Sequence, residues 1–300
     1  MNADVPAYRS GERDAGRPNT AGERIRDALK VAARGIPADH GIAGTRPQVV
    51  TDARERRGLI VEIVIVLVLT FGMSGLRSLL SLIDAQLHRG GIGSQSVALN
   101  TSSSTVGIID LAEQLLDAVH LFAIAALAVY LLWRSGITAR ILGLKPVKVA
   151  SDVSWGVAAA AVIGLPGLGL YVAARALGIN AEVLPSTLTD AWWRLPVLIL
   201  AAIGNAAAEE FLVVGYLITR LRQLGAGENS SLLGSAVLRG SYHLYQGFGG
   251  GVGNLAMGLV YGRFFQCTAR IWPLVIGHAL IDTVAFGYAL LGDHLGLLTR

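Results

Sequence analysis

The sequence predicts an all-α fold: a polytopic bundle of about seven transmembrane helices. Of the 300 residues, 53% are hydrophobic and 15% are charged, whereas soluble domains carry roughly 25% charged residues. The mean hydropathy is +0.54. Two adjacent carboxylates, Glu209 and Glu210, interrupt an apolar run that is long enough to cross a bilayer.

The charge pattern indicates a lipid bilayer as the main partner and gives no support for nucleic acid. The net charge is +4, but the basic residues gather near the N-terminus and in alternate loops, as membrane topology requires. Cys267 is the one cysteine of the sequence. Neither a disulfide framework nor a thiolate metal cluster is therefore expected.

Three regions follow along the chain. Residues 1–57 are rich in Arg, Asp, Gly, Ala and Pro without a sustained apolar period, which predicts a disordered, basic, cytoplasmic tail. Residues 58–191 are expected to hold the N-terminal transmembrane helices, and residues 192–300 a second group of transmembrane helices that includes the two glutamates. The predicted spans are 59–83, 106–133, 153–176, 193–221, 231–246, 254–267 and 272–291.

Two glycine patterns bear on how these helices meet. The cluster 247–253 is predicted to break the helical structure between the fifth and sixth spans. Asn254, Gly258 and Gly262 recur every four residues, which predicts a smooth stripe for close helix contact. The Gly, Ser and Thr residues of 88–105 show no period and predict an exposed loop.

The orientation follows from the positive charges. With the tail in the cytoplasm, the basic loops at 134–148, 220–222 and 263–270 lie on the same side of the membrane, as the positive-inside rule demands. We therefore expect a multi-pass membrane protein with its N-terminus in the cytoplasm and its C-terminus outside. The membrane is expected to be the plasma membrane of a bacterium.

The polar residues of three predicted spans converge on one site. An ionised carboxylate at mid-bilayer costs roughly 2.5–3.5 kcal/mol, so Glu209 and Glu210 must face a polar chamber or a partner. Helix rise puts Glu209 about 16 Å, and His243 about 20 Å, from the cytoplasmic ends of their spans. His278 and Asp282 are four residues apart and share one helix face. A buried site for water chemistry is therefore expected.

Other interpretations fit the same residues. A lone histidine in a span is often only an interhelical hydrogen-bond partner, and a glutamate pair could serve a proton- or cation-coupled transporter. Asp110, Glu113, Asp117 and His120 lie at helical spacing on the second span, which keeps such a pathway open. Asp110 and Glu113 fall in its first two turns, near the outer interface. A non-proteolytic binding or immunity protein is a further alternative.

The residues resemble three motifs of the CAAX-protease and bacteriocin-processing (CPBP) family, also called Abi or type II CAAX prenyl endopeptidases. Glu209 and Glu210 open a segment that resembles the pattern Glu-Glu-x-x-x-Arg. His243 matches the histidine of Phe-x-x-x-His, and His278 with Asp282 matches His-x-x-x-Asn/Asp. The resemblance covers about residues 192–291, and its specificity lies in the set of three motifs.

The resemblance implies an intramembrane endopeptidase that acts on a peptide or membrane-protein substrate. It also implies that residues 192–300 form the catalytic transmembrane region and that the helices surround a polar chamber that faces the cytoplasm. Glu209 and His243 would activate a water molecule, while His278 and Asp282 would stabilise the oxyanion. Glu209, His243 and His278 could also supply a zinc site with two histidines and one carboxylate. The family has been described as glutamate-dependent as well, and the spacing leaves both mechanisms open.

The sequence departs from the family pattern at two positions. Val214 stands where the family has Arg, and Arg239 stands where it has Phe. Arg239 lies one turn before His243 on the same helix face. Our hypothesis is that Arg239 replaces the missing guanidinium and pairs with Glu210. The alternative is that Arg239 extends to the cytoplasmic interface.

Overall fold

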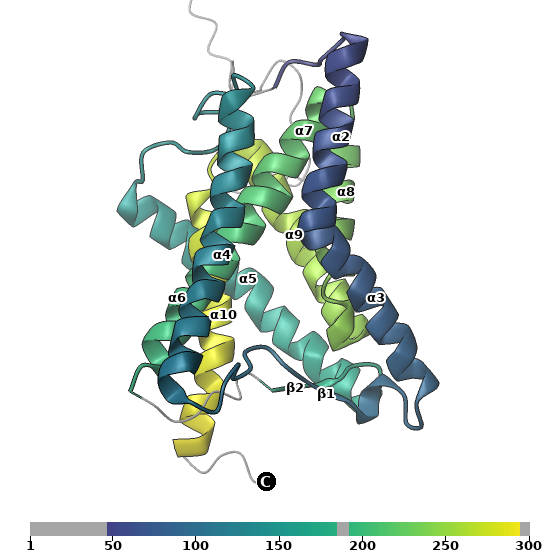
Figure 1. Ribbon diagram of the computed structural model, residues 1–300, viewed down its shortest axis with the longest axis vertical. Coiled ribbons are helices and arrows are strands. Elements are labelled where there is room, and N and C mark those ends of the chain that lie inside the picture. Colours follow the sequence, from purple (N-terminus) through teal and green to yellow (C-terminus); the bar gives the residue numbers. More distant parts are fainter. Residues whose placement is uncertain (1–46, 185–191, 295–300) are drawn as a thin grey trace, which may run out of the picture.

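A computed structural model describes residues 47–184 and 192–294 of the chain. Residues 1–46, which make up most of the predicted tail, lie outside the described residues, as do 185–191 and 295–300. The structure is a helical bundle (Figure 1). Its helices are α2 (Ala53–Leu69), α3 (Phe71–Leu87), α4 (Gly107–Arg134), α5 (Val149–Ala176), α6 (Arg194–Glu209), the π-helix η2 (Glu210–Leu217), α7 (Ile218–Gln223), α8 (Glu228–Ser241), α9 (Phe248–Thr268) and α10 (Trp272–His294).

The predicted all-α membrane fold is confirmed in its coarse form. Among the described residues, α4, α5 and the continuous helix α6–η2–α7 are long and apolar enough to cross a membrane, and the bent pair α2–α3 adds a fourth span if it counts as one. Helix α8 has only 14 residues, and the apolar part of α10, Trp272–Phe286, is short. The structure supports neither the count of seven spans nor an opening toward the cytoplasm.

The first predicted span, 59–83, is not one straight helix. Helices α2 and α3 meet at an angle of 50°, and Thr70 between them has φ −132° and ψ −128°. A Cβ atom on Gly72 would lie 2.7 Å from the carbonyl oxygen of Leu67. Because such an approach excludes any side chain, the bend requires glycine at this position.

The last residues of the predicted tail are ordered. Asp52 caps α2, since its side chain accepts hydrogen bonds from the backbone N–H groups of Arg54 and Glu55, both at 2.9 Å. The backbone N–H of Val50 donates to the carbonyl of Gln223 (2.9 Å). These contacts attach the chain from residue 47 onward to the end of α7.

The glycine cluster forms a helix, which corrects the predicted break at 247–253. Gly247 has a positive φ of 115°, and α9 begins directly after it at Phe248. The interruption comes earlier, where α8 ends at Ser241. The glycine stripe predicted for close contact is confirmed, since a Cβ atom on Gly258 would lie 2.8 Å from the Cα of Ala236 on α8. The close approach of α9 to α8 offsets the low helix propensity of glycine.

The predicted exposed loop 88–105 contains a short strand. Strand β1 (Ser96–Ala98) pairs in parallel with β2 (Glu182–Leu184), with Ser96 opposite Glu182. Ile92, in the turn η1 (Ile92–Ser94), is only 2% exposed. The loop is therefore packed onto the bundle end.

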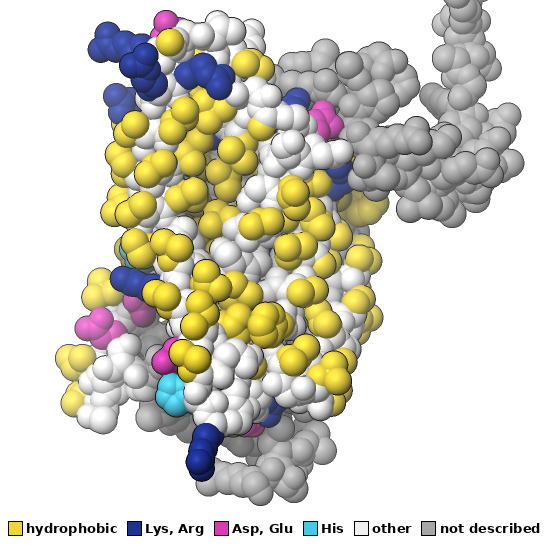
Figure 2. All heavy atoms as spheres, turned by 90° about the vertical axis from the view of Figure 1, so that its right-hand side faces the viewer, with side chains coloured by type: hydrophobic (Ala, Val, Ile, Leu, Met, Phe, Trp, Pro, Cys, Tyr) yellow, Lys and Arg dark blue, Asp and Glu magenta, His cyan; other side chains and the backbone are white. Residues whose placement is uncertain are grey.

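The continuous helix α6–η2–α7 lies at the centre of the bundle. Val213, Val214 and Tyr216 of η2 have no exposed surface, and η2 contacts α4, α8 and α9. The face that Figure 2 shows is largely apolar, and several basic side chains gather at its upper end. This arrangement puts the adjacent glutamates in the interior of the protein.

Candidate functional site

Glu209 and Glu210 lie where α6 changes into the π-helix η2. Both are buried, at 3% and 0% exposure. A π-helical turn shifts the hydrogen-bond pattern of the backbone and occurs often at functional sites. In η2 the carbonyl of Val213 accepts a hydrogen bond from the hydroxyl of Ser235 on α8 (2.7 Å), and the carbonyl of Gly215 accepts one from the hydroxyl of Thr219 on α7 (2.6 Å). These side-chain bonds help to satisfy the altered backbone.

Glu210 joins the three motif-bearing segments. Its Oε1 accepts hydrogen bonds from Nη2 of Arg239 (2.5 Å) on α8 and from Nδ1 of His278 (2.8 Å) on α10. The expected pair between Arg239 and Glu210 is therefore present. Arg239 has no exposed surface, so it does not extend to the interface. Buried charges are tolerated when they are paired in this way.

Glu209 is held on one side only. The hydroxyl of Tyr242 donates to its Oε2 (2.7 Å), and Nη2 of Arg239 lies 3.7 Å from the same oxygen. Among the described residues none donates a hydrogen bond to Oε1. Oε1 is thus the oxygen that can engage water or substrate.

His243 does not lie within a spanning helix, as the sequence had suggested, but two residues after the end of α8. Its Nδ1 lies 3.0 Å from the backbone oxygen of Arg239. Because a carbonyl can only accept, Nδ1 carries the proton in this contact, and Nε2 of the neutral ring is left with the lone pair. That nitrogen can act as a base.

Helix α3 holds the segment that carries His243. The hydroxyl of Ser78 donates to the backbone oxygen of Tyr242 (3.0 Å). The rings of Phe71 and Tyr242 have centroids 4.8 Å apart. A Cβ atom on Gly75 would lie 2.4 Å from Oγ of Ser241. An element outside the matched motifs thus fixes the position of the second motif.

The third motif has a partner that the sequence analysis missed. Nε2 of His278 lies 3.6 Å from Oδ2 of Asp282, and the amide of Asn205 donates to the same oxygen (2.9 Å). Asn205 precedes Glu209 by four residues and so shares its helix face, which was the available signal. For Tyr242, also missed, adjacency to His243 alone gave no such signal.

The acidic residues of α4 do not join this cluster. Asp110 is buried and accepts a hydrogen bond from the backbone N–H of Ser103 (2.7 Å), so it organises the preceding loop. Glu113, Asp117 and His120 are exposed. The alternative of a proton or cation pathway along this helix therefore has no connection to the glutamates through these side chains.

The set that could have bound zinc is not arranged as a metal site. Among the described residues, no group of three or more His, Cys, Asp or Glu side chains is placed to hold a metal ion. The described residues therefore do not show the geometry of a zinc site.

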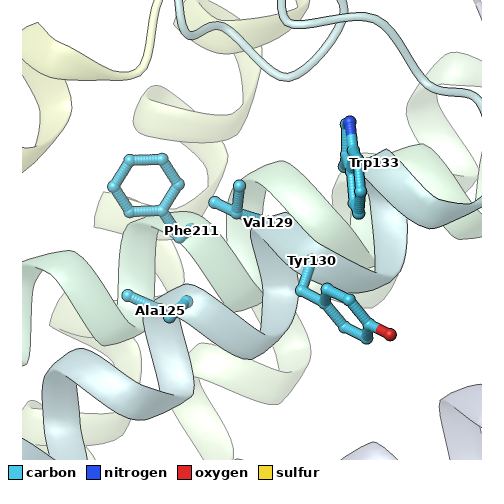
Figure 3. Close-up of a pocket in the computed structure, with 6 residues that line it drawn as sticks. Ala125, Val129, Tyr130, Trp133 and Phe211 are labelled. Carbon is cyan, nitrogen blue, oxygen red and sulfur yellow. The ribbon is translucent and has the colours of Figure 1, made fainter.

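A shallow hollow of about 330 Å³ on α4 is distinct from the site. Figure 3 shows its apolar walls, in which Ala125, Val129, Trp133 and Phe211 face a common space. It has no acidic or histidine side chain in its lining. Its apolar lining suits a lipid chain and not the chemistry of the glutamates.

The site thus combines Oε1 of Glu209, which accepts no hydrogen bond from the described residues, with Nε2 of His243, which has a lone pair. His278 and Asn205 add polar N–H groups. Together they can activate a water molecule and stabilise a developing negative charge.

Comparison with known proteins agrees with the motifs. A family model described as type II CAAX prenyl endopeptidase Rce1-like matches residues 191–284. The match confirms the resemblance and includes every residue of the cluster from Asn205 to Asp282. It supports a membrane location and, at the level of the family, an intramembrane protease role. No curated protein and no solved structure matches the chain.

Proposed function

We propose that the chain is an intramembrane endopeptidase that hydrolyses a peptide bond with a water molecule activated by Glu209 and His243. The observation that carries this proposal is the convergence on the glutamate pair. Glu210 binds Arg239 and His278, while Glu209 binds Tyr242 and leaves its Oε1 free. The family match over residues 191–284 gives independent support.

In the first step, the water molecule binds between Oε1 of Glu209 and Nε2 of His243. Glu209 takes one proton of the water as general base, and the water oxygen attacks the carbonyl carbon of the substrate. Tyr242 contributes by occupying Oε2, which directs the reacting oxygen of Glu209 toward the water.

In the second step, polar N–H groups stabilise the oxyanion. His278 donates Nδ1–H to Glu210, so Nε2–H of the imidazolium is its remaining donor. One N–H of Asn205 binds Asp282, and its second amide N–H is the other candidate donor. Asp282 positions both groups. The C–N bond then breaks, and the leaving nitrogen receives the proton held by Glu209.

The substrate class is a peptide or a segment of a membrane protein. We place the protein in a bacterial plasma membrane with its N-terminal side in the cytoplasm. The end of α4, at Arg134, and helix α7, which carries Arg222, lie toward the same end of the bundle as the start of α2 (Figure 1), which agrees with the positive-inside rule. Accessibility of a tag before Met1 in intact cells tests this orientation, and labelling from outside would reverse it.

The experiment that tests the activity compares membrane-peptide products from cells that carry wild type, Glu209→Gln or His120→Ala. His120 is a matched control, because it is exposed on a spanning helix and outside the cluster. We expect products to disappear with Glu209→Gln and to persist with His120→Ala. Identical product profiles from all three would remove the protease proposal and favour a transporter or a non-proteolytic binding protein.

A further inference from the structure

Several buried charged side chains of this protein pair with an opposite charge. Arg220 binds Glu62 (2.8 Å), Arg239 binds Glu210 (2.5 Å), and Arg270 binds Asp152 (2.5 Å). Such pairing is the usual way to keep an ionised group at membrane depth, where an isolated charge is costly. A charged side chain in the middle of a spanning helix that lacks such a partner is an exception to this pattern and a candidate for a contact with another molecule.

Arg77 on α3 and Asp117 on α4 are such exceptions. Both are exposed, and neither makes a hydrogen bond or ion pair with any residue that the structure describes. Glu113 and His120 lie on the same stripe of α4 as Asp117 and are unpaired in the same sense. Charged side chains interrupt the apolar surface in Figure 2. Helix α4 thus presents negative charge, and helix α3 presents a positive charge.

The two charges lie at matching depth. Arg77 is ten residues from the last residue of α3, Leu87 (87 − 77), and Asp117 is ten residues from the first residue of α4, Gly107 (117 − 107). Both distances correspond to about 15 Å of helix rise. The two helix ends lie at the same end of the bundle (Figure 1). The side chains could therefore meet without moving either charge across the membrane.

The pair cannot form within one chain in this fold. Helix α3 packs against α8 and the turn η3 (Leu244–Gln246), whereas α4 packs against α6 and η2. Figure 1 shows α3 and α4 on opposite flanks of the bundle, both toward the viewer. In the part of the chain that the structure describes, α3 and α4 do not bring Arg77 and Asp117 together, so a pair between these two side chains requires a second molecule.

We propose that a second copy of this chain docks on the face between α3 and α4, with Arg77 of each copy paired to Asp117 of the other. A two-fold axis along the membrane normal keeps every residue at its depth and brings α3 of one copy against α4 of its partner. The interface is isologous, so the pair is made twice. A second copy carries both an arginine and an aspartate at the required depth, whereas a helix of an unrelated protein need not carry both.

Cysteine cross-linking tests this contact without relying on the hydrolytic activity. The background is Cys267→Ser with Glu209→Gln, so that the test is independent of proteolysis. Differently tagged copies with Arg77→Cys and Asp117→Cys are co-expressed in the same membranes. We expect a disulfide-linked dimer that carries both tags. Arg77→Cys expressed alone should give little dimer, because two-fold symmetry keeps the two α3 helices apart. Cross-linking of Arg77→Cys to itself, without the mixed product, would overturn the proposal.

A charge exchange provides the quantitative test. In liposomes, dimer fractions are counted from photobleaching steps of labelled protein. Arg77→Asp and Asp117→Arg should each weaken dimerisation roughly tenfold, equivalent to about 1.4 kcal/mol. The combination Arg77→Asp/Asp117→Arg should restore it. Arg89→Asp, in the loop after α3, is the matched control and should change little. Equal dimer fractions in all variants, or a double variant as weak as the single ones, would contradict the proposed interface.

Discussion

Replacing Arg239 by Ala removes the guanidinium that the glutamate pair depends on. Arg239 is fully buried, and its Nη2 lies 2.5 Å from Oε1 of Glu210 and 3.7 Å from Oε2 of Glu209. Its guanidinium carbon also lies 5.9 Å from the ring centroid of Tyr261. Breaking one buried ion pair by removing one partner costs roughly 3–5 kcal/mol, because the other charge is left uncompensated. We expect a loss of this size from Arg239→Ala.

The assay measures thermal unfolding of purified protein in detergent, together with hydrolysis of a peptide identified from the cellular products. Arg222→Ala is the matched control. Arg222 lies 4.0 Å from Glu228 and is 23% exposed, and such pairs contribute about 1 kcal/mol or less. Arg239→Ala should therefore lower the unfolding midpoint clearly and abolish hydrolysis, whereas Arg222→Ala should do neither.

The family pattern offers a rescue. Val214 is buried in η2, one turn after Glu210 and at the position where the family has Arg. In the Arg239→Ala background, Val214→Arg can direct a guanidinium into the vacated space and should recover part of the stability and activity. Arg239→Ala protein with wild-type stability and full activity would refute the reasoning, since Glu210 would then not need its cation.

Three further variants examine the groups around the glutamates. Tyr242→Phe keeps the ring contact with Phe71 but removes the donor to Glu209, and kcat should fall about tenfold or more with little change in KM; an unchanged kcat would exclude this role. Asn205→Ala should lower kcat about 100-fold if its amide binds the oxyanion, and a wild-type rate would remove it from the mechanism. Gly75→Ala should reduce activity, because its Cβ would lie 2.4 Å from Oγ of Ser241. Adding Ser241→Ala should restore activity, and no recovery would show that the clash is not the cause.

The sequence predicted which residues form the cluster better than it predicted the neighbouring side chains and the backbone turns that hold them. Glu209, Glu210 and the two histidines were identified because ionisable residues are costly in apolar spans. The contact between Arg239 and Glu210 could be predicted from relative depth along two helices. Tyr242 could not, because its bond to Glu209 depends on how the chain turns after α8 ends.

Backbone irregularities explain the errors in the fold. Glycine propensity predicted a break at 247–253, but close packing of α9 on α8 stabilises a helix there. Apolarity alone predicted a straight first span, whereas the chain bends next to Gly72. The π-helix after Glu209 left no trace in the residue pattern, because all of its residues are buried and, apart from Glu210, none is charged.

The central claim is that Glu209 and His243 act together on one water molecule. The most direct test measures hydrolysis in reconstituted membranes for wild type, Glu209→Gln, His243→Ala and the double variant, after insertion has been verified for each. Groups that act as a unit are not additive. We therefore expect both single variants to fall to background and the double variant to be no slower than either one. A wild-type rate in Glu209→Gln would contradict the claim.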